Sequence, residues 1–269
     1  MDKERFYKAA IVILLAVVLV MGLIMILKKT PKKARISPPA KVTRHGKAVT
    51  AKIAIVIDDV GYTLSNFNIL EGVKEPLTFS VLPGLDFSES AARELKSRGF
   101  QIILHLPMEP KEKRKLETNT ILTSMDEPNV RSIIKNDLAD LPEAIGVSNH
   151  MGSKVTEDES TMSVVLDELK IKHMFFLDSF VTAHSVAKRL AEKVHIKFAQ
   201  RDVFLDNSLD PGYIRQQLVE LKRKAELKGQ AVGIGHDRKI TLEVLKEEIP
   251  KIKKEGYKFV FVSELARIQ

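Results

Sequence analysis

The sequence predicts an α/β domain in which about seven or eight parallel strands alternate with helices and close into a barrel. Residues Ile53 to Ile57 are all apolar and four of them are β-branched, which is typical of a parallel strand buried on both faces. Further apolar runs follow, and most begin 23 to 33 residues apart, which leaves room for a helix between strands. An open doubly wound sheet is the second choice. No Gly-x-Gly-x-x-Gly motif follows any of these runs, which argues against dinucleotide binding.

The individual elements follow from apolar runs and their end signals. Gly99 fits the end of a helix, and Ile214, Leu218 and Leu221 recur on one side of another. The charged segment 111–120 is expected to be a loop, and 203–207 a loop across the barrel mouth. Helices are expected at 88–98, 128–140, 161–170, 184–193, 211–227 and 242–254. Strands are expected at 53–57, 77–82, 100–105, 144–147, 174–178, 197–202, 230–236 and 259–263.

The N-terminal part differs from the rest of the chain. The segment from Ala9 to Leu27 is apolar and uncharged with lysines on both sides, and roughly 20 apolar residues suffice to span a bilayer. Residues 1–29 are therefore expected to form a single transmembrane helix or uncleaved anchor that makes the membrane a partner. Residues 30–50 are basic and contain Pro31, Pro38 and Pro39, which predicts an extended tether before a domain at 51–269.

Composition narrows the possible chemistry. The formal net charge of +8 owes much to residues 28–52, which hold nine Lys or Arg residues and no acid. These basic residues have no interleaved aromatics, so we expect no nucleic-acid partner, and they suit adhesion to anionic lipid head groups. The chain contains no cysteine, which leaves histidine and carboxylate side chains as the ligands for any metal.

Most predicted strands end in polar or ionisable residues. The carboxyl ends of barrel strands meet at one face, so two aspartates and three histidines are expected to share one concavity that could hold zinc or another divalent metal. His105 has the alternative of a buried structural imidazole, and Asp178 with Ser179 could instead cap the next helix. Strand alternation also predicts that Asp58 and Asp59 point to opposite faces. The polar strand ends are Asp58-Asp59, His105, Asn149-His150, Asp178-Ser179, Arg201-Asp202, His236 and Ser263-Glu264.

Six blocks of sequence, in order, resemble the divergent polysaccharide deacetylase family. The resemblance covers essentially all of residues 51–269 and implies a distorted (β/α) barrel similar to that of the NodB-type carbohydrate esterases. NodB-type enzymes take both histidine ligands from one His-x-x-x-His loop, whereas position 109 is Glu here. The blocks are Ala54-Ile-Val-Ile-Asp-Asp-Val-Gly61, Leu104-His-Leu-Pro-Met-Glu-Pro110, Asn149-His-Met-Gly-Ser153, Phe175-Phe-Leu-Asp-Ser179, Arg201-Asp-Val-Phe-Leu-Asp-Asn207 and Ile234-Gly-His236.

The resemblance implies metal-dependent removal of N-acetyl groups from a polysaccharide or peptidoglycan-type glycan on the periplasmic or extracytoplasmic side. Asp58 would be the general base and His236 the general acid. Asp59, His105 and His150 would bind the metal, most plausibly zinc. Two alternatives remain open: an inert domain that binds glycan or a partner, and a hydrolase of another ester or amide. Substrate contacts are expected from Asn149, Asp178, Ser179, Arg201, Asp202, Asp206 and Asn207.

Overall fold

The computed structural model of the protein describes Met21 and residues 51–268. The predicted anchor and tether lie outside the described residues, apart from Met21. In the part of the chain that is described, no helix combines the length and apolarity needed to cross a membrane. The roles of the anchor and the tether therefore stay predictions.

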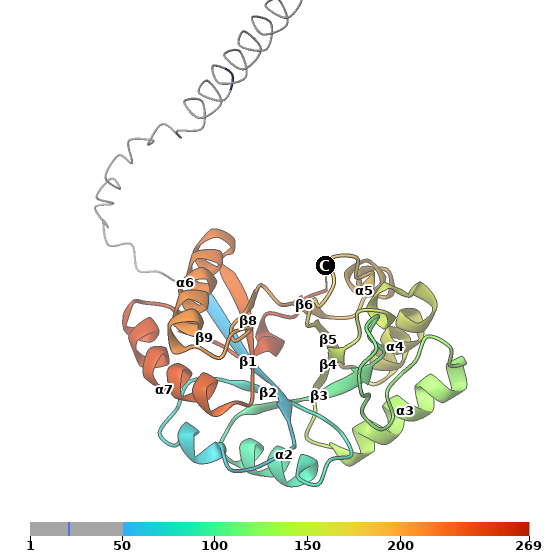
Figure 1. Cartoon of the computed structure of the whole chain (residues 1–269). Helices are drawn as coiled ribbons and strands as arrows, with labels where there is room; N and C mark the ends of the chain where they lie inside the picture. The colour runs from blue at the N-terminus through green and yellow to red at the C-terminus, as the bar shows by residue number, and fades with distance from the viewer. Residues whose placement is uncertain (1–20, 22–50, 269) are drawn as a thin grey trace, which may run out of the picture. The chain divides into compact units, whose positions relative to one another are not determined.

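Residues 51–268 form one parallel sheet with helices on its outer side (Figure 1). The strands are β1 (Lys52–Val60), β2 (Thr78–Val81), β3 (Gln101–Met108), β4 (Gly146–Met151), β5 (Phe175–Asp178), β6 (Phe198–Gln200), β7 (Val203–Phe204), β8 (Gln230–His236) and β9 (Lys258–Phe259). The helices are α2 (Ser88–Ser97), α3 (Glu127–Asp140), α4 (Glu159–Ile171), α5 (Ala187–Val194), α6 (Pro211–Lys228) and α7 (Lys239–Lys254), with short 3-10 helices η1 (Phe67–Leu70), η2 (Val155–Glu157) and η3 (Val262–Glu264).

The strand order is β6-β5-β4-β3-β2-β1-β8-β7, and β9 pairs with β1. The neighbouring strands pair in parallel, and the sheet curls into a half-barrel, so the predicted α/β class and parallel sheet are confirmed. The two strands at the ends of this order, β6 and β7, are joined by Arg201 and Asp202 alone. The Arg201 N–H donates to Asp178 O at 3.0 Å and the Asp202 N–H to Val232 O at 2.8 Å, so the chain links the two edges of the curled sheet.

Two predicted segments differ from the structure. Val203 and Phe204 form β7 beside β8, although this segment was expected to be a loop. Val203 is buried in the main core, which favours an extended conformation there. The expected strand at 259–263 is shorter, because it ends after β9 and the chain turns into η3, where the Glu264 carboxylate accepts a hydrogen bond from the Phe261 N–H at 3.1 Å.

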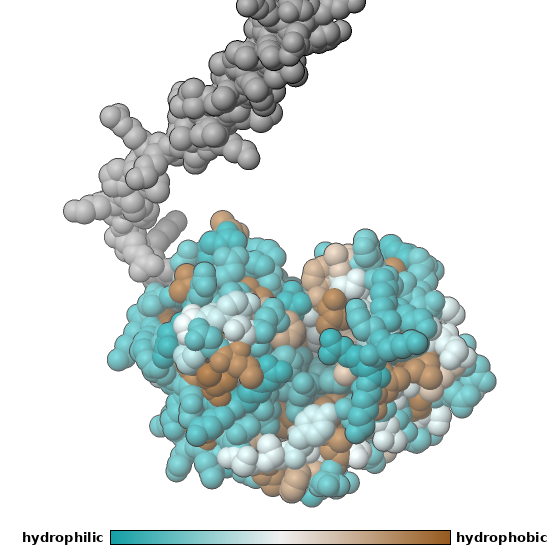
Figure 2. Space-filling model, in the orientation of Figure 1, coloured by the Kyte–Doolittle hydropathy of each residue, from teal (hydrophilic) through white to brown (hydrophobic). Residues whose placement is uncertain are grey.

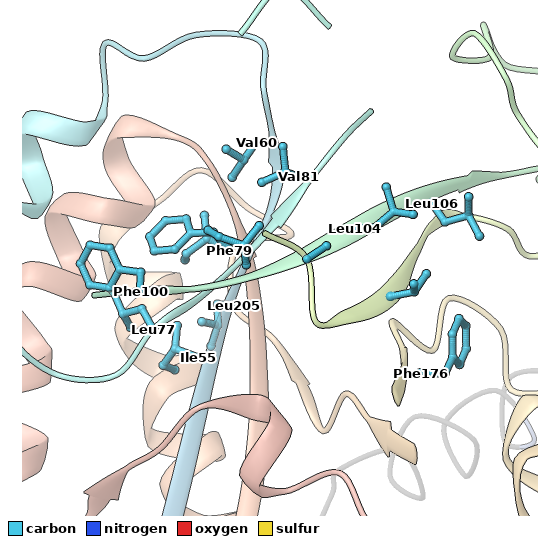
Figure 3. Packing of buried hydrophobic residues seen from close by; sticks show 14 of the residues in the cluster. Ile55, Val60, Leu77, Phe79, Val81, Phe100, Leu104, Leu106, Phe176 and Leu205 are labelled. Carbon is cyan, nitrogen blue, oxygen red and sulfur yellow. The ribbon is translucent and has the colours of Figure 1, made fainter. Parts of the chain in front are cut away.

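Two apolar clusters fix the sheet. The larger cluster fills the space between the sheet and its helices, and Figure 3 shows Ile55, Phe79 and Phe100 within it. The smaller cluster lies on the inner face and includes Ala54 and Val56 of β1. Because side chains alternate along a strand, the inner-face cluster identifies which later residues point inward.

Helix ends follow local signals. The Asp210 side chain accepts a hydrogen bond from the Tyr213 N–H at 2.7 Å and so caps the start of α6, with Pro211 as its first residue. Gly229 ends α6 in the left-handed conformation, with φ of 77°. The chain then enters β8 directly, and this short connection fixes where His236 emerges at the other end of that strand.

Candidate metal centre

Asp58 and Asp59 lie at a β-bulge near the end of β1. Asp58 continues the inward alternation of Ala54 and Val56, whereas Asp59 has φ of 61° and the pairing with β2 shifts register between Ile57 and Val60. At a bulge, a residue in the left-handed region does not follow the regular alternation of side chains between the two faces of the sheet. The expectation that the two carboxylates face opposite sides was therefore wrong, and both lie beside His105.

His105 on β3 and His150 on β4 face the same concavity. Nε2 of His105 lies 3.3 Å from Oδ1 of Asp59, and Nδ1 of His150 lies 2.9 Å from the same oxygen. The two imidazole rings meet edge to face with centroids 5.0 Å apart. Nδ1 of His105 is held at 2.8 Å from Oγ of Ser148, which leaves Nε2 of His105 directed at the carboxylates.

Asp59, His105 and His150 could hold a divalent metal ion. One ligand atom from each lies within 4.8 Å of the other two. Nε2 of His150 is buried and has no hydrogen-bond partner among the described residues, an exception that a bound metal ion would account for. Two imidazoles and one carboxylate without cysteine are a donor set suited to zinc with an open position. The three residues therefore fit the group that the sequence predicts.

The histidines also set the charge of the Asp59 carboxyl group. Burial alone would raise its pKa, but the hydrogen bonds from His105 and His150 hold the pKa well below its ordinary value. Asp59 is thus an anion in this arrangement, as a metal ligand must be.

Asp58 is the more deeply buried of the two carboxylates. Its exposed fraction is 3%, and burial raises its pKa, an effect that the positive potential of His105 opposes. Oδ2 of Asp58 lies 3.7 Å from Nε2 of His105, whereas Oδ1 is buried without a hydrogen-bond partner. This oxygen therefore keeps an unused capacity to accept a proton.

His236 is oriented by a buried aspartate. Nδ1 of His236 lies 2.9 Å from Oδ1 of Asp206. The other oxygen of this carboxylate, Oδ2, accepts hydrogen bonds from the backbone N–H of His236 and from the Thr241 hydroxyl. Burial alone would lower the pKa of His236, but the hydrogen bond with Asp206 and the charges of Asp206, Asp59 and Asp58 together raise it. Nε2 of His236 lies 3.7 Å from Oδ2 of Asp59, so the imidazole faces the same concavity.

These groups open into a cavity of about 630 Å³. Asp59, His105, His150 and His236 all line it. Figure 2 shows a largely hydrophilic face that is hollowed between the lobe with α6 and α7 and the lobe with α4 and α5. The cavity is large enough for a sugar residue to reach the four side chains.

Of the seven expected substrate contacts, Asp206 and Asn207 line this cavity and the other five do not. Asp178 shares the outward side of β5 with Phe176, and its carboxylate accepts hydrogen bonds from the Phe180 N–H at 2.7 Å and the Ser185 hydroxyl at 2.6 Å. The alternative expectation, that Asp178 and Ser179 cap the next helix, is not met, because α5 begins after Val186 without a side-chain cap; Asp178 instead holds the loop before that helix.

Of the other four residues outside the cavity lining, Asn149, Arg201 and Asp202 have side-chain partners, whereas the Ser179 hydroxyl is buried without a hydrogen-bond partner. The side-chain oxygen of Asn149 accepts from the Ser179 N–H at 2.8 Å. The Arg201 guanidinium donates to the carbonyls of Ser179 and Phe180 and lies 4.6 Å from the Phe204 ring centre. The Asp202 carboxylate accepts from the Lys228 ammonium at 2.6 Å and the Val232 N–H at 2.9 Å.

Glu109 does not join the three candidate ligands. Its carboxylate accepts hydrogen bonds from the backbone and hydroxyl of Thr123, both at 2.9 Å, and pairs with Lys154 at 2.7 Å. The second histidine of the candidate metal centre therefore comes from the neighbouring strand rather than from position 109.

Sequence reasoning missed two supporting residues. Ser148 precedes His150 by two positions, so strand alternation alone places it on the inward face of β4 beside His105. Thr241 lies on α7, and nothing in its local sequence indicates the hydrogen bond with Asp206.

The fold is similar to solved structures. An uncharacterized protein from Agrobacterium tumefaciens aligns with a TM-score of 0.77 at 20% identity, covering 82% of this chain and 91% of the other. A family 4 acetyl xylan esterase from Clostridium thermocellum in complex with a cobalt ion aligns with a TM-score of 0.51 at 14% identity, over 80% and 89% of the two chains. A mutant of a CE4 family pseudoenzyme from Bacillus anthracis with restored enzymatic activity aligns with a TM-score of 0.51 at 14% identity, over 83% and 70%.

Sequence relatives are closer. Uncharacterized protein YibQ from Escherichia coli is 33% identical over 201 residues, which is 75% of this chain and 63% of that protein, so the chain spans less than two thirds of its length. An uncharacterized protein from Haemophilus influenzae is 33% identical over 195 residues, or 72% and 70% of the two chains. The family model for divergent polysaccharide deacetylases matches residues 55–266. The chain therefore belongs to the divergent polysaccharide deacetylase family.

Proposed function

We propose that this protein is a metal-dependent hydrolase that removes N-acetyl groups from a polysaccharide. The observation that carries the proposal is the convergence of Asp59, His105 and His150 within 4.8 Å, with Asp58 and His236 directly beside them. The structural likeness to an acetyl xylan esterase in complex with a cobalt ion supports it. The apolar segment at residues 9–27 supports an anchored protein whose domain works on the extracytoplasmic side, where envelope glycans lie.

Asp59, His105 and His150 would hold the ion, with zinc as the proposed metal. When bound, a divalent ion of this kind activates water as a nucleophile and polarises the carbonyl that is attacked. Ser148 keeps Nδ1 of His105 occupied, so its Nε2 stays directed at the centre. The proposal assigns these residues to binding and orientation.

Asp58 and His236 would move the protons. The unpartnered Oδ1 of Asp58 would accept the proton of the attacking water as general base, and the other oxygen of this carboxylate lies 3.7 Å from Nε2 of His105. The protonated His236, held by Asp206, donates its Nε2 proton to the nitrogen of the leaving amine. Acetate and a free amino sugar are then the products, and one proton has been taken and one returned.

The experiment combines metal content with hydrolysis. Full-length protein purified without chelator is expected to contain about one zinc or similar ion per chain and to release acetate from N-acetylated oligosaccharides. Asp58→Asn is expected to keep the metal and lose about 10²- to 10⁴-fold in rate, whereas His105→Ala loses both. Exposed Asp86→Asn serves as the matched control for the charge change and is expected to behave like the wild type.

The opposite result would favour the second candidate function, an inert glycan-binding protein. Glu109, at the position where NodB-type enzymes carry their second histidine, supports that candidate. Metal-free protein that binds an N-acetylated oligosaccharide without releasing acetate would establish it and refute hydrolysis.

A further inference from the structure

Two arginines line the cavity without a carboxylate partner. Arg114 comes from the loop that follows β3, and Arg238 follows His236 by two residues at the start of α7. The Arg238 guanidinium donates to the carbonyl of Asp206 at 3.3 Å, and neither arginine forms an ion pair with any described residue. Both side chains are exposed, so their donors are free to meet a ligand.

Two lysines in the same region, in contrast, form ion pairs. Lys111 pairs with Glu157 at 2.6 Å, and Lys154 pairs with Glu109 at 2.7 Å. The two guanidinium groups that line the cavity have no such ion pair with any described residue.

The carboxylates that line the cavity do not neutralise the positive charge of the two arginines. The carboxylates of Asp59 and Asp206 are bound to histidines of the centre, and both would face the ion or the His236 cation. Glu112 remains, with a single long contact of 3.4 Å to the Ser153 hydroxyl. Two guanidinium groups against one free carboxylate give the cavity mouth an excess positive charge.

From this arrangement we propose that the protein selects an acidic glycan, in which a carboxylate or a phosphate near the acetylated sugar is bound by Arg114 and Arg238. A guanidinium presents paired N–H donors that match either anion, and it does so better than an ammonium group. The inference rests on the proposed function for the identity of the reacting group, but binding of the anion does not require turnover. It adds a substrate class to the site.

The test compares three probes on the full-length protein: an N-acetylated oligosaccharide with one uronic acid, its carboxyl-reduced counterpart and a phosphorylated counterpart. Calorimetry is expected to show at least one anionic probe bound about tenfold more tightly than the reduced one, with the preference falling as salt rises. Whichever anion binds more tightly identifies the source. Each single change, Arg114→Gln or Arg238→Gln, is expected to weaken that binding about two- to fivefold, and the double variant about tenfold.

Lys115→Gln is the matched control, because this exposed residue neighbours Arg114 on the same loop and does not line the cavity. Arg238→Lys keeps the charge and is expected to bind more tightly than Arg238→Gln, which separates a lost anion contact from local misfolding. Equal binding of all three probes, or arginine variants that bind like the wild type, would overturn the inference. Arginine-dependent binding without acetate release would instead overturn hydrolysis alone, and equal cleavage of all probes would overturn the acidic preference alone.

Discussion

The buried carboxyl group of Asp137 leads to a prediction about stability that does not depend on the candidate metal centre. It lies near the end of α3, is fully buried, and neither carboxylate oxygen has a hydrogen-bond partner. Burial raises its pKa from the ordinary 3.8 to about 7, with the Asn119 side chain acting in the opposite direction and the charge of Asp140 adding to the rise. Between about pH 4 and 7 the folded protein therefore holds a proton at Asp137 that the unfolded chain has already released.

The sign and the size follow from proton linkage. A raised folded pKa means that this contribution to stability is complete below the unfolded value and is lost as the pH rises through the folded value. The interval from 3.8 to about 7, at about 1.4 kcal/mol per pH unit, corresponds to about 4 kcal/mol. Asp137 should thus make the folded protein less stable at pH 8 than at pH 4 by about that amount.

The perturbation is Asp137→Asn, which has nearly the same shape and cannot ionise. Its buried amide will cost about 1–3 kcal/mol at every pH, so the informative quantity is the pH dependence and not the stability at one pH. Urea unfolding from pH 4 to pH 8.5 is expected to give a wild-type curve that falls by about 4 kcal/mol more than that of the variant. For the control Asp86→Asn, at an exposed site, the curve of stability against pH should run parallel to that of the wild type.

Parallel curves for the wild type and Asp137→Asn would refute this reasoning. They would mean that Asp137 stays ionised in the folded protein, through solvent or a donor that reaches it. A shift of the whole curve without a change in its slope would have the same meaning, because an unpaired amide is destabilising at every pH to the same extent.

Three further predictions concern packing, capping and catalysis. Gly146→Ala places a Cβ 2.3 Å from the buried Phe175 ring and should cost about 1–3 kcal/mol, seen as a lower Tm; an unchanged Tm would contradict it. Asp210→Ala removes the cap of α6 and should cost about 1 kcal/mol in urea unfolding, whereas Asp210→Asn should recover most of it. Asp206→Asn removes the anion that raises the pKa of His236, so the alkaline limb of the proposed deacetylation rate should move to lower pH; a limb that stays in place would exclude His236 as the acid.

Much of the fold follows from the sequence because the strands are buried on both faces. Uninterrupted apolar runs such as Ile53 to Ile57 signal parallel strands without any knowledge of the rest of the chain. The two misplaced segments are short and depend on distant partners. Val203 and Phe204 are extended because β8, about thirty residues later, offers them hydrogen bonds. Such non-local pairing leaves no signal in two residues.

The candidate site could be predicted as a set of residues but not as a geometry. His105, His150 and His236 were expected to converge because parallel strand ends meet, and the structure brings them to one cavity. Asp178 is also at a strand end, yet it alternates with Phe176 and points outward. The position of a residue at a strand end is thus insufficient, and the parity of its position relative to the inner-face residues decides whether it reaches the cavity.

The bulge at Asp59 shows why the alternation of side chains along β1 does not predict the direction of this carboxylate. β1 pairs regularly with β8 up to Asp58, which lies opposite His236, and pairing with β2 resumes at Val60. Pairing on both sides fixes the chain around Asp59 and holds it at φ of 61°, a conformation that costs a non-glycine residue of order 1–3 kcal/mol. Regular alternation would have sent this carboxylate to the helix side. Because the bulge returns it to the inner face, two adjacent carboxylates lie beside His105, one as candidate ligand and one as candidate base.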